Sequence, residues 1–369
     1  MTKPARVLIV DDSAVMRNLL STLLAADPEI EVVGTAGDPY VARDRIKQLN
    51  PDVVTLDVEM PHMDGVTFLR KIMTLRPMPV IMVSSLTQAG AETTLEALDI
   101  GAVDFVAKPT NNAVDAMTGL AEELRSKVKA AANTRIGARR ASVPALSPRR
   151  ERNVRPVDKI ILIGASTGGV EALKVVLMGM PAVCPPILIT QHMPPRFTAA
   201  FAERLNRECP IGVSEAAHND LVDPNHAYIA PGSHHLELVR TGGRYMCSLS
   251  DSPPVSGHRP SVDVLFRSAA RVAGRISVAA ILTGMGKDGA EGLLELRQAG
   301  ATTLGQDEAS SLIYGMPKAA FERGAVMRQI SLSHMADAIL DACDAESNAQ
   351  HPGLSHAAHA DGLNRSVGR

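Results

Sequence analysis

Short apolar runs alternate with stretches of helical spacing along the N-terminal part of the chain. The apolar runs are Val7–Val10, Val32–Thr35, Val53–Leu56, Val80–Val83 and Val103–Val106. Apolar residues recur at helical spacing between them, at Ala14–Ala26, Tyr40–Leu49, Val66–Leu75 and Ala91–Ile100. Strands that alternate with helices predict a doubly wound α/β domain, in which helices cover both faces of a parallel sheet.

The same alternation returns in the C-terminal part. Strand-like runs occur at Lys159–Ile163, Ile187–Thr190, Val278–Leu282 and Ala301–Gly305. Helical spacing occurs at Val170–Met178, Arg196–Arg207 and Lys287–Gln298. Three further runs alternate apolar and polar residues, at Ala227–Ile229, His235–Arg240 and Arg244–Leu249, the last two around a Thr-Gly-Gly turn. We therefore predict a second doubly wound domain, Rossmann-like, with an antiparallel hairpin added at one edge.

The two predicted domains are separated by a basic segment. Residues 135–156 hold several arginines and prolines and almost no acid, which is typical of an exposed linker, although such a run can also bind nucleic acid or an acidic partner. We place the domains at residues 1–125 and 157–345, with the linker at 126–156. Residues 346–369, with His351, His356 and His359, show no periodicity and are predicted to be a disordered tail.

Composition narrows the class of protein. The chain has 369 residues, 45% of them hydrophobic and 21% charged, with a formal net charge of −2, which argues against nucleic-acid binding as the main function. The four cysteines form no CxxC pair and are interpreted as reduced thiols. No apolar run approaches the ~20 residues of a membrane span, and the N-terminus does not resemble a signal peptide. We expect a cytoplasmic protein that is not inserted in a membrane.

Polar residues follow the predicted strands of the first domain. Asp11 and Asp12 follow the first strand, Asp57 the third, Ser84 the fourth and Lys108 the fifth. Carboxyl ends of parallel strands meet at one sheet edge, where three carboxylates would repel one another without a cation. Mg²⁺ suits such a set of oxygen ligands, and the lysine and serine would face a phosphoryl group. Each residue alone is as well explained as a helix cap or surface group, but the whole set in this order favours a site.

These motifs resemble the two-component receiver domain over residues 5 to about 125. The resemblance implies a flavodoxin-like fold, phosphorylation of Asp57 and a histidine kinase as the phosphodonor. It implies Mg²⁺ as the cofactor, with ligands at Asp12, Asp57 and the backbone carbonyl of Glu59 and with Asp11 adjacent in the acidic pocket. It assigns the switch positions to Ser84 and Phe105 and the phosphate-pairing lysine to Lys108.

A G-x-S-x-G turn follows the first strand of the second domain and contains Ser166. Such a turn can present a nucleophile, but it is also found as a phosphate-binding or purely structural loop. His192 follows the second strand and Asp288 the third, so a nucleophile, a base and an orienting anion can meet at one sheet edge. Their order differs from the Ser-Asp-His order of α/β-hydrolases, which argues against that fold. The loop at Gly284–Gly289 could hold an oxyanion with its backbone N–H groups; it lacks the motifs of a phosphate cradle.

The second half resembles the CheB family of protein-glutamate methylesterases from bacterial chemotaxis. The motifs GASTGG, QHMP, HRPSVD and TGMGKDG carry this resemblance from about residue 157 to 345. It implies a catalytic triad of Ser166, His192 and Asp288, with Thr167 beside the nucleophile and the Met285 N–H as oxyanion donor. It implies hydrolysis of glutamate γ-methyl esters on chemoreceptors, with release of methanol, and deamidation of receptor glutamines at the same site. No cofactor is expected for this reaction.

The resemblance also implies that the unphosphorylated receiver packs over the esterase cleft and loosens on phosphorylation. Two rival hypotheses belong to other classes. A receiver-regulated DNA-binding protein would need a helix-turn-helix or a basic face in the second half, and the sequence shows neither. A nucleotide-binding module would use Gly164–Gly169 as a phosphate turn.

Overall fold

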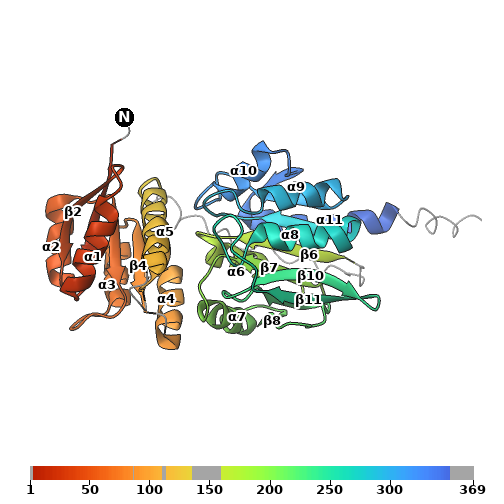
Figure 1. Cartoon of the computed structure of the whole chain (residues 1–369), viewed down its shortest axis with the longest axis horizontal. Helices are drawn as coiled ribbons and strands as arrows, with labels where there is room; N and C mark the ends of the chain where they lie inside the picture. The colour runs from red at the N-terminus through yellow and green to blue at the C-terminus, as the bar shows by residue number, and fades with distance from the viewer. Residues whose placement is uncertain (1–2, 86, 110–113, 135–158, 350–369) are drawn as a thin grey trace, which may run out of the picture.

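Two parallel sheets, each between layers of helices, make up the two halves of the molecule, as Figure 1 shows. The computed structural model describes residues 3–85, 87–109, 114–134 and 159–349. The N-terminal domain runs from β1 to α5, and the C-terminal domain from β6 to α11. The two predicted doubly wound domains are thus confirmed.

The sheet of the N-terminal domain has five strands in the order β2-β1-β3-β4-β5, all parallel. Its strands are β1 Ala5–Val10, β2 Ile30–Ala36, β3 Val53–Asp57, β4 Val80–Ser84 and β5 Asp104–Ala107. Its helices are α1 Ala14–Ala25, α2 Pro39–Leu49, α3 Gly65–Leu75, α4 Gln88–Ile100 and α5 Val114–Ala132. This is the flavodoxin-like strand order, in which the crevice lies between β1 and β3.

Neighbouring residues of each strand enter opposite hydrophobic layers, because side chains alternate across a sheet. Leu8 and Val10 of β1 pack with the helices α2, α3 and α4. Val7 and Ile9 pack with α1 and α5 on the other face. Both faces are covered, which explains why the strands have continuous apolar runs rather than alternation.

The sheet of the C-terminal domain has seven parallel strands in the order β14-β13-β12-β6-β7-β9-β8. Its strands are β6 Ile160–Ala165, β7 Ile187–Gln191, β8 Gly212–Glu215, β9 His226–Ile229, β12 Ser277–Ile281, β13 Thr302–Gln306 and β14 Arg328–Ile330. Its α-helices are α6 Gly169–Met178, α7 Phe197–Glu208, α8 Val262–Val272, α9 Ala290–Gln298, α10 Met316–Glu322 and α11 Leu332–Ala349, and a 3₁₀ turn occupies Gly274–Ile276. The strand order reverses at β6, so the crevice between β6 and β12 is where an open α/β sheet binds ligands.

The prediction of an antiparallel addition at the sheet edge is wrong in its placement. β10 His235–Thr241 and β11 Arg244–Ser250 pair with each other and form a separate two-stranded sheet. The β9 strand belongs to the main sheet, where it is parallel to both neighbours. Leu236 and Leu238 bury one face of the hairpin against α8 and the sheet, so the alternating pattern reports a ribbon lying on the domain rather than an edge strand.

Two helices extend past the domain boundaries placed at residues 125 and 345. The helix α5 runs to Ala132, so the first residues of the predicted 126–156 linker are helical. Val128 and Ala131 in this last part of α5 are buried in the core of the N-terminal domain, so the helix continues to pack against that domain. The helix α11 runs to Ala349, beyond the predicted domain end at residue 345. Residues 135–158 and the histidines of 350–369 lie outside the described residues.

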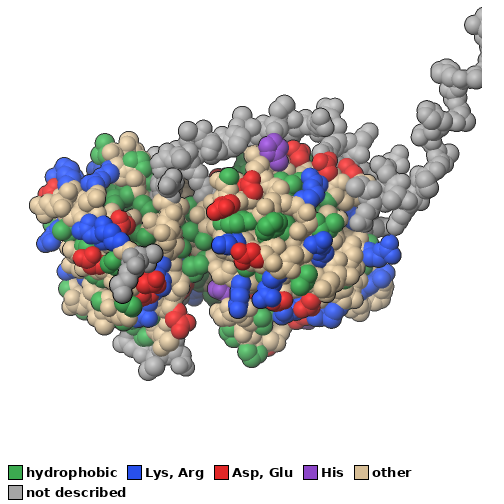
Figure 2. All heavy atoms as spheres, turned by 90° about the horizontal axis from the view of Figure 1, so that it is seen from above, with side chains coloured by type: hydrophobic (Ala, Val, Ile, Leu, Met, Phe, Trp, Pro, Cys, Tyr) green, Lys and Arg blue, Asp and Glu red, His purple; other side chains and the backbone are tan. Residues whose placement is uncertain are grey.

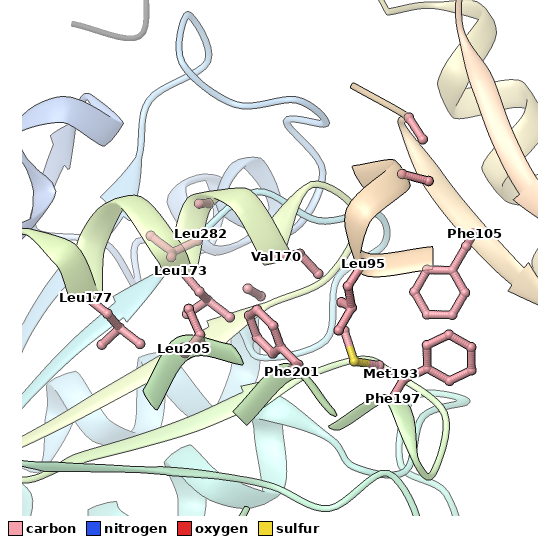
Figure 3. Close-up of a cluster of buried hydrophobic side chains, with 14 of the residues drawn as sticks. Leu95, Phe105, Val170, Leu173, Leu177, Met193, Phe197, Phe201, Leu205 and Leu282 are labelled. Carbon is pink, nitrogen blue, oxygen red and sulfur yellow. The ribbon is translucent and has the colours of Figure 1, made fainter. Parts of the chain in front are cut away.

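The two domains share one hydrophobic cluster, which Figure 3 shows. Phe105 at the start of β5 stacks on Phe197 at the start of α7, with ring centroids 4.4 Å apart. Leu95 of α4 lies beside Met193 in the same cluster. Figure 1 shows α4 and α5 on the side of the N-terminal domain that faces the C-terminal domain. The predicted packing of one domain on the other is therefore present in this structure.

Ion pairs and a buried hydrogen bond accompany this apolar contact. Asp99 of α4 pairs with both Lys174 of α6 and Arg204 of α7. Asp104 of β5 accepts a hydrogen bond from the Thr167 hydroxyl at 2.5 Å, and both residues are buried. The second contact joins the N-terminal domain to the residue next to Ser166.

The state of the cysteines and the distribution of surface charge are as the composition predicts. All four cysteines are free. Among the described residues, no helix is both long and apolar enough to span a bilayer. On the face shown in Figure 2, Lys and Arg side chains are interspersed with Asp and Glu over both domains, so this face has no broad basic surface. The helices of the C-terminal domain cover its sheet, as expected for an α/β domain rather than a helix-turn-helix module.

Candidate active site

The acidic residues of the N-terminal domain converge at the crevice between β1 and β3. Carboxylate oxygens of Asp11, Asp12 and Asp57 all lie within 4.8 Å of one another. Asp11 and Asp57 are buried, whereas Asp12 is exposed. Lys108 places its ammonium 2.7 Å from Asp57 Oδ2 and 3.3 Å from Asp11 Oδ2. The three carboxylates and Lys108 therefore lie together at this crevice.

This pocket holds more negative charge than its lysine can neutralise. Burial raises the pKa of Asp57 to about 6, Lys108 opposes that rise, and the charge of Asp11 adds to it. Three oxygen donors around a space open on the Asp12 side suit a hard divalent cation such as Mg²⁺, which keeps part of its water shell. The residues present therefore fit the cofactor that the receiver resemblance implies. The Glu59 backbone carbonyl stays a predicted ligand.

The two switch positions make contacts on α4 and at the domain interface. The Ser84 hydroxyl accepts a hydrogen bond from Thr94 at 2.7 Å and lies 3.3 Å from the Gly90 carbonyl. Phe105 is buried against Phe197 of the C-terminal domain. One switch residue thus contacts α4 and the other contacts the covered face of the second domain.

In the C-terminal domain, β6 and the tight turn after it position Ser166. Its N–H donates to the Thr283 carbonyl at 3.1 Å, and its own carbonyl accepts from Gly169 at 2.6 Å. Gly168 has a φ of 77°, a conformation that disfavours other residues. A Cβ at Gly169 would lie 2.1 Å from the Gln191 side-chain oxygen. Gly168 of the G-x-S-x-G motif is therefore favoured by the turn, and Gly169 just after the motif is required by the neighbouring strand.

His192 follows β7 and is tied to the same edge by its backbone N–H, which donates to the Ala165 carbonyl at 3.1 Å. Its Nε2 lies 2.8 Å from Asp288 Oδ2. A carboxylate only accepts hydrogen bonds, so in the neutral imidazole Nε2 carries the proton and Nδ1 has a free lone pair. Nδ1 is buried and has no hydrogen-bond partner among the described residues. The imidazole is therefore oriented with an unprotonated nitrogen available as a base.

Asp288 receives more donors than the sequence predicted. Besides His192, it accepts from the Ser261 hydroxyl at 2.8 Å and from the backbone N–H groups of Val262 at 2.7 Å and Asp263 at 3.2 Å. Burial alone would raise the pKa of Asp288, but the hydrogen bonds from His192, Val262 and Ser261 outweigh it and hold that pKa below its usual value. The carboxylate thus lies at the N-terminus of α8, where the helix favours an anion. It does not cap α9, which begins after Gly289.

The glycine-rich loop after β12 lies directly against the serine. A Cβ at Gly284 would be 2.8 Å from the Ser166 Cβ, so only glycine fits there. The Thr283 hydroxyl donates to the Thr167 carbonyl at 3.0 Å and joins this loop to the serine turn. Met285 is half-buried, and its N–H makes no hydrogen bond within the part of the chain that the structure describes. The predicted oxyanion donor is therefore available.

Ser166 and His192 line a cavity of about 650 Å³ that lies between the two domains. Asp104 and Phe105 of the N-terminal domain line its other side. Within the described residues the Ser166 hydroxyl makes no hydrogen bond to His192, a bond that catalytic groups often form only when substrate is present. The predicted triad residues are thus gathered at one cleft, and the other domain covers it.

From the sequence, the resemblance suggests substrate positioning for His258 and Arg259 and assigns no role to Ser261. In the structure, the Ser261 hydroxyl donates to Asp288, and His258 stacks on His192 with ring centroids 3.7 Å apart. Both residues belong to the HRPSVD motif, so the motif marked this segment as important without showing which atoms its residues contact. Asp104 is the other omission; it precedes Phe105 in β5, and nothing in its local pattern shows that it reaches Thr167.

A receiver-type sheet with an acidic pocket, followed by an α/β domain with serine, histidine and aspartate at its strand ends, defines a class: hydrolases controlled by a receiver domain. Residues 7–117 match the model of the response regulator receiver domain, and residues 161–339 match the CheB methylesterase model. The chain belongs to the CheB methylesterase family.

Two curated relatives match nearly the whole chain. A protein-glutamate methylesterase/protein-glutamine glutaminase of Caulobacter vibrioides is 57% identical over 341 residues, which are 92% of this chain and 98% of the relative. One of Pseudomonas aeruginosa is 54% identical and covers 91% of this chain and 96% of its own length. The CheB methylesterase catalytic domain of Thermotoga maritima is a solved structure with 35% identity and a TM-score of 0.49, covering 50% of this chain and 97% of that one.

Proposed function

We propose that this chain hydrolyses glutamate γ-methyl esters on chemoreceptors and deamidates receptor glutamines, under control of phosphorylation at Asp57. The observation that carries the proposal is the His192–Asp288 pair, 2.8 Å apart, in the cleft that Ser166 lines. Family membership supplies the reaction class, and the site supplies a nucleophile, a base and an orienting anion.

In the proposed mechanism, Ser166 Oγ attacks the ester carbonyl while His192 Nδ1 takes its proton. Asp288 accepts the Nε2–H bond and stabilises the imidazolium that forms. The Met285 N–H stabilises the oxyanion, and the His192 imidazolium then protonates the departing methoxide to give methanol. Water, deprotonated by His192, attacks the acyl-enzyme and releases glutamate. With a glutamine substrate, the same steps release ammonia.

We propose that the N-terminal domain, residues 1–125 extended by the rest of α5, is the controlling receiver. Asp11, Asp12, Asp57 and the Glu59 carbonyl would hold Mg²⁺, which neutralises charge when a histidine kinase supplies the phosphoryl group. Lys108 would pair with the phosphoryl oxygens, since it already contacts both buried carboxylates. The contact between Phe105 and Phe197 offers a path by which this event loosens the cover over Ser166. Kinase and receptor as partners place the reaction in the cytoplasm.

Methanol release from receptor carrying labelled methyl groups tests the proposal. Ser166→Ala should lower the rate by about 10⁴-fold or more, because the nucleophile is removed. Ser248→Ala, on the hairpin strand β11, is the matched control and should keep the wild-type rate. A wild-type rate in Ser166→Ala would contradict the assignment.

A fluorophosphonate probe separates this proposal from the nucleotide-binding hypothesis, because only a nucleophilic serine is labelled. We expect labelling of the phosphorylated wild-type chain and none of Ser166→Ala. Two results together would favour the rival. Labelling would be absent, and the chain would bind ATP or GTP with a dissociation constant that neither Ser166→Ala nor fluorophosphonate treatment changes.

A further inference from the structure

The His192 imidazole has a second neighbour, the ring of His258, whose role the reaction does not assign. The rings are nearly parallel, with centroids 3.7 Å apart and an interplanar angle of 14°. His258 lies in the segment between β11 and α8, three residues before Ser261, which hydrogen-bonds Asp288. One short segment, from His258 to Ser261, therefore contacts both the face of the His192 ring and the Asp288 carboxylate at its edge.

The backbone of His258 is fixed by a tight turn. Val255 and His258 exchange both backbone hydrogen bonds at 3.0 Å. The two residues between them have positive φ, 55° at Ser256 and 81° at Gly257, as in the turns that close two-residue hairpins. Arg259 donates to the carbonyls of Asp251 and Ser252 and ties the following residue to the loop. The ring of His258 thus projects from a constrained support.

Stacking restrains a motion that the Asp288 hydrogen bond leaves free. The bond at Nε2 fixes one atom of the imidazole, and the ring can still tilt about that atom. A ring packed against its face removes this freedom and keeps Nδ1 in one direction. Catalytic geometry is sensitive to such shifts, since a misplacement of ~1 Å can lower the rate by about 100-fold.

His258 also has a suitable charge state. The pKa of His258 is lowered to about 4, mainly by burial and in smaller part by His192 and by Lys127 of the N-terminal domain, while Asp288 opposes the change. A neutral ring stacked on His192 adds no positive charge when His192 takes the proton of Ser166. Among the described residues, no hydrogen bond uses a ring nitrogen of His258, and its ring stacks on that of His192.

We propose that His258 is a positioning residue, whose ring holds the His192 imidazole in the plane that presents Nδ1 to Ser166. This inference rests on the proposed hydrolase function. It assigns His258 no contact with substrate and no proton transfer, so an aromatic ring without nitrogen should serve in its place.

The test measures kcat and KM for methanol release by the phosphorylated full-length chain. His258→Ala should lower kcat about 10-fold with KM changed less than about 2-fold, because a transition-state geometry is lost rather than substrate binding. His258→Phe should restore kcat to within about 3-fold of wild type, because phenylalanine keeps the stacked face. His218→Ala, an exposed histidine outside the cavity, is the matched control and should keep wild-type kinetics.

Thermal melting of each variant shows whether the fold is retained, and variants are compared at a temperature at which all are folded. A wild-type kcat in His258→Ala overturns the inference, and so does a kcat in His258→Phe as low as in His258→Ala. An increase in KM alone also overturns it and would make His258 a substrate contact. Failure of the proposed function is distinguishable, because Ser166→Ala would then retain the wild-type rate.

Discussion

Two buried aspartates, one in each domain, lie at the carboxyl ends of parallel strands but have opposite electrostatic environments. Asp57 is 1% exposed and Asp288 is 2% exposed. The pKa of Asp57 is raised to about 6, chiefly by burial, although Lys108 and the Glu59 N–H oppose the rise. Burial acts in the same direction on Asp288, yet its hydrogen bonds lower its pKa below the usual value. The same residue type, at the end of a strand in one domain and in the loop after a strand in the other, thus has two different electrostatic environments.

The difference lies in the number and kind of donors. Asp288 accepts from an imidazole, a hydroxyl and two backbone N–H groups, which satisfy a permanent anion that orients a base. Asp57 shares Lys108 with a second carboxylate and accepts one long backbone hydrogen bond, from the Glu59 N–H at 3.3 Å. A carboxylate with unbalanced negative charge around it favours a divalent cation and can then act as a nucleophile. The number of hydrogen-bond donors around each carboxylate therefore distinguishes Asp288, an anion that orients a base, from Asp57, a carboxylate suited to react.

Removing the charge of Asp288 should have the largest effect on activity of the changes considered. Asp288→Asn should lower kcat for methanol release by about 10⁴-fold, because the amide no longer fixes the His192 tautomer. KM should change little. A loss below about 10-fold would show that the four hydrogen bonds to Asp288 are structural only.

Removing the charge of Asp57 should affect activation and leave the basal reaction intact. With a small-molecule phosphodonor and Mg²⁺, the wild-type rate should rise by about 5- to 150-fold, the range of ordinary allosteric coupling. Asp57→Asn should keep the unphosphorylated rate and show no rise. Asp44→Asn, an exposed aspartate on α2, is the control and should respond like wild type. Activation that persists in Asp57→Asn would place the phosphorylation site elsewhere.

The interface between the domains is expected to have a smaller effect. Asp99→Ala removes the acid that pairs with Lys174 and Arg204, so the unphosphorylated rate should rise by up to about 5-fold, since partly exposed pairs contribute about 0.2–1 kcal/mol. Arg271→Ala, which removes an exposed ion pair with Glu237 inside the C-terminal domain, should leave the rate unchanged. A decrease in Asp99→Ala would show that the interface promotes activity.

The smallest expected effect is on stability and depends on pH. The raised pKa of Asp57 contributes stability that is fully present below its unfolded value near 3.8 and is lost as pH rises through about 6. In EDTA, Asp57→Asn should therefore raise Tm relative to wild type by a few degrees (about 4 °C) at pH 8 and by less at pH 5. Adding Mg²⁺ should raise the wild-type Tm and narrow the difference at pH 8. An equal difference at both pH values would contradict the unbalanced charge assigned to this pocket.

Much of the architecture could be predicted because it follows from local patterns. Continuous apolar runs that end in Asp57 or before Ser166 identify buried parallel strands, and the glycines of the serine turn mark positions where a side chain cannot fit. The hairpin was predicted correctly from its turn and alternation, but its predicted place at the edge of the sheet was wrong. Alternation reports that one face is buried and does not say against which element.

The sequence by itself determined the two doubly wound domains, the acidic set around Asp57 and the candidates Ser166, His192 and Asp288, because strand ends and turn motifs are local properties. Only the tertiary structure decided that α8 surrounds Asp288 with donors, that His258 stacks on His192, and that Asp104 reaches Thr167 from the other domain. These contacts join residues far apart in the chain. Their energies depend on distance and burial, which no local pattern encodes.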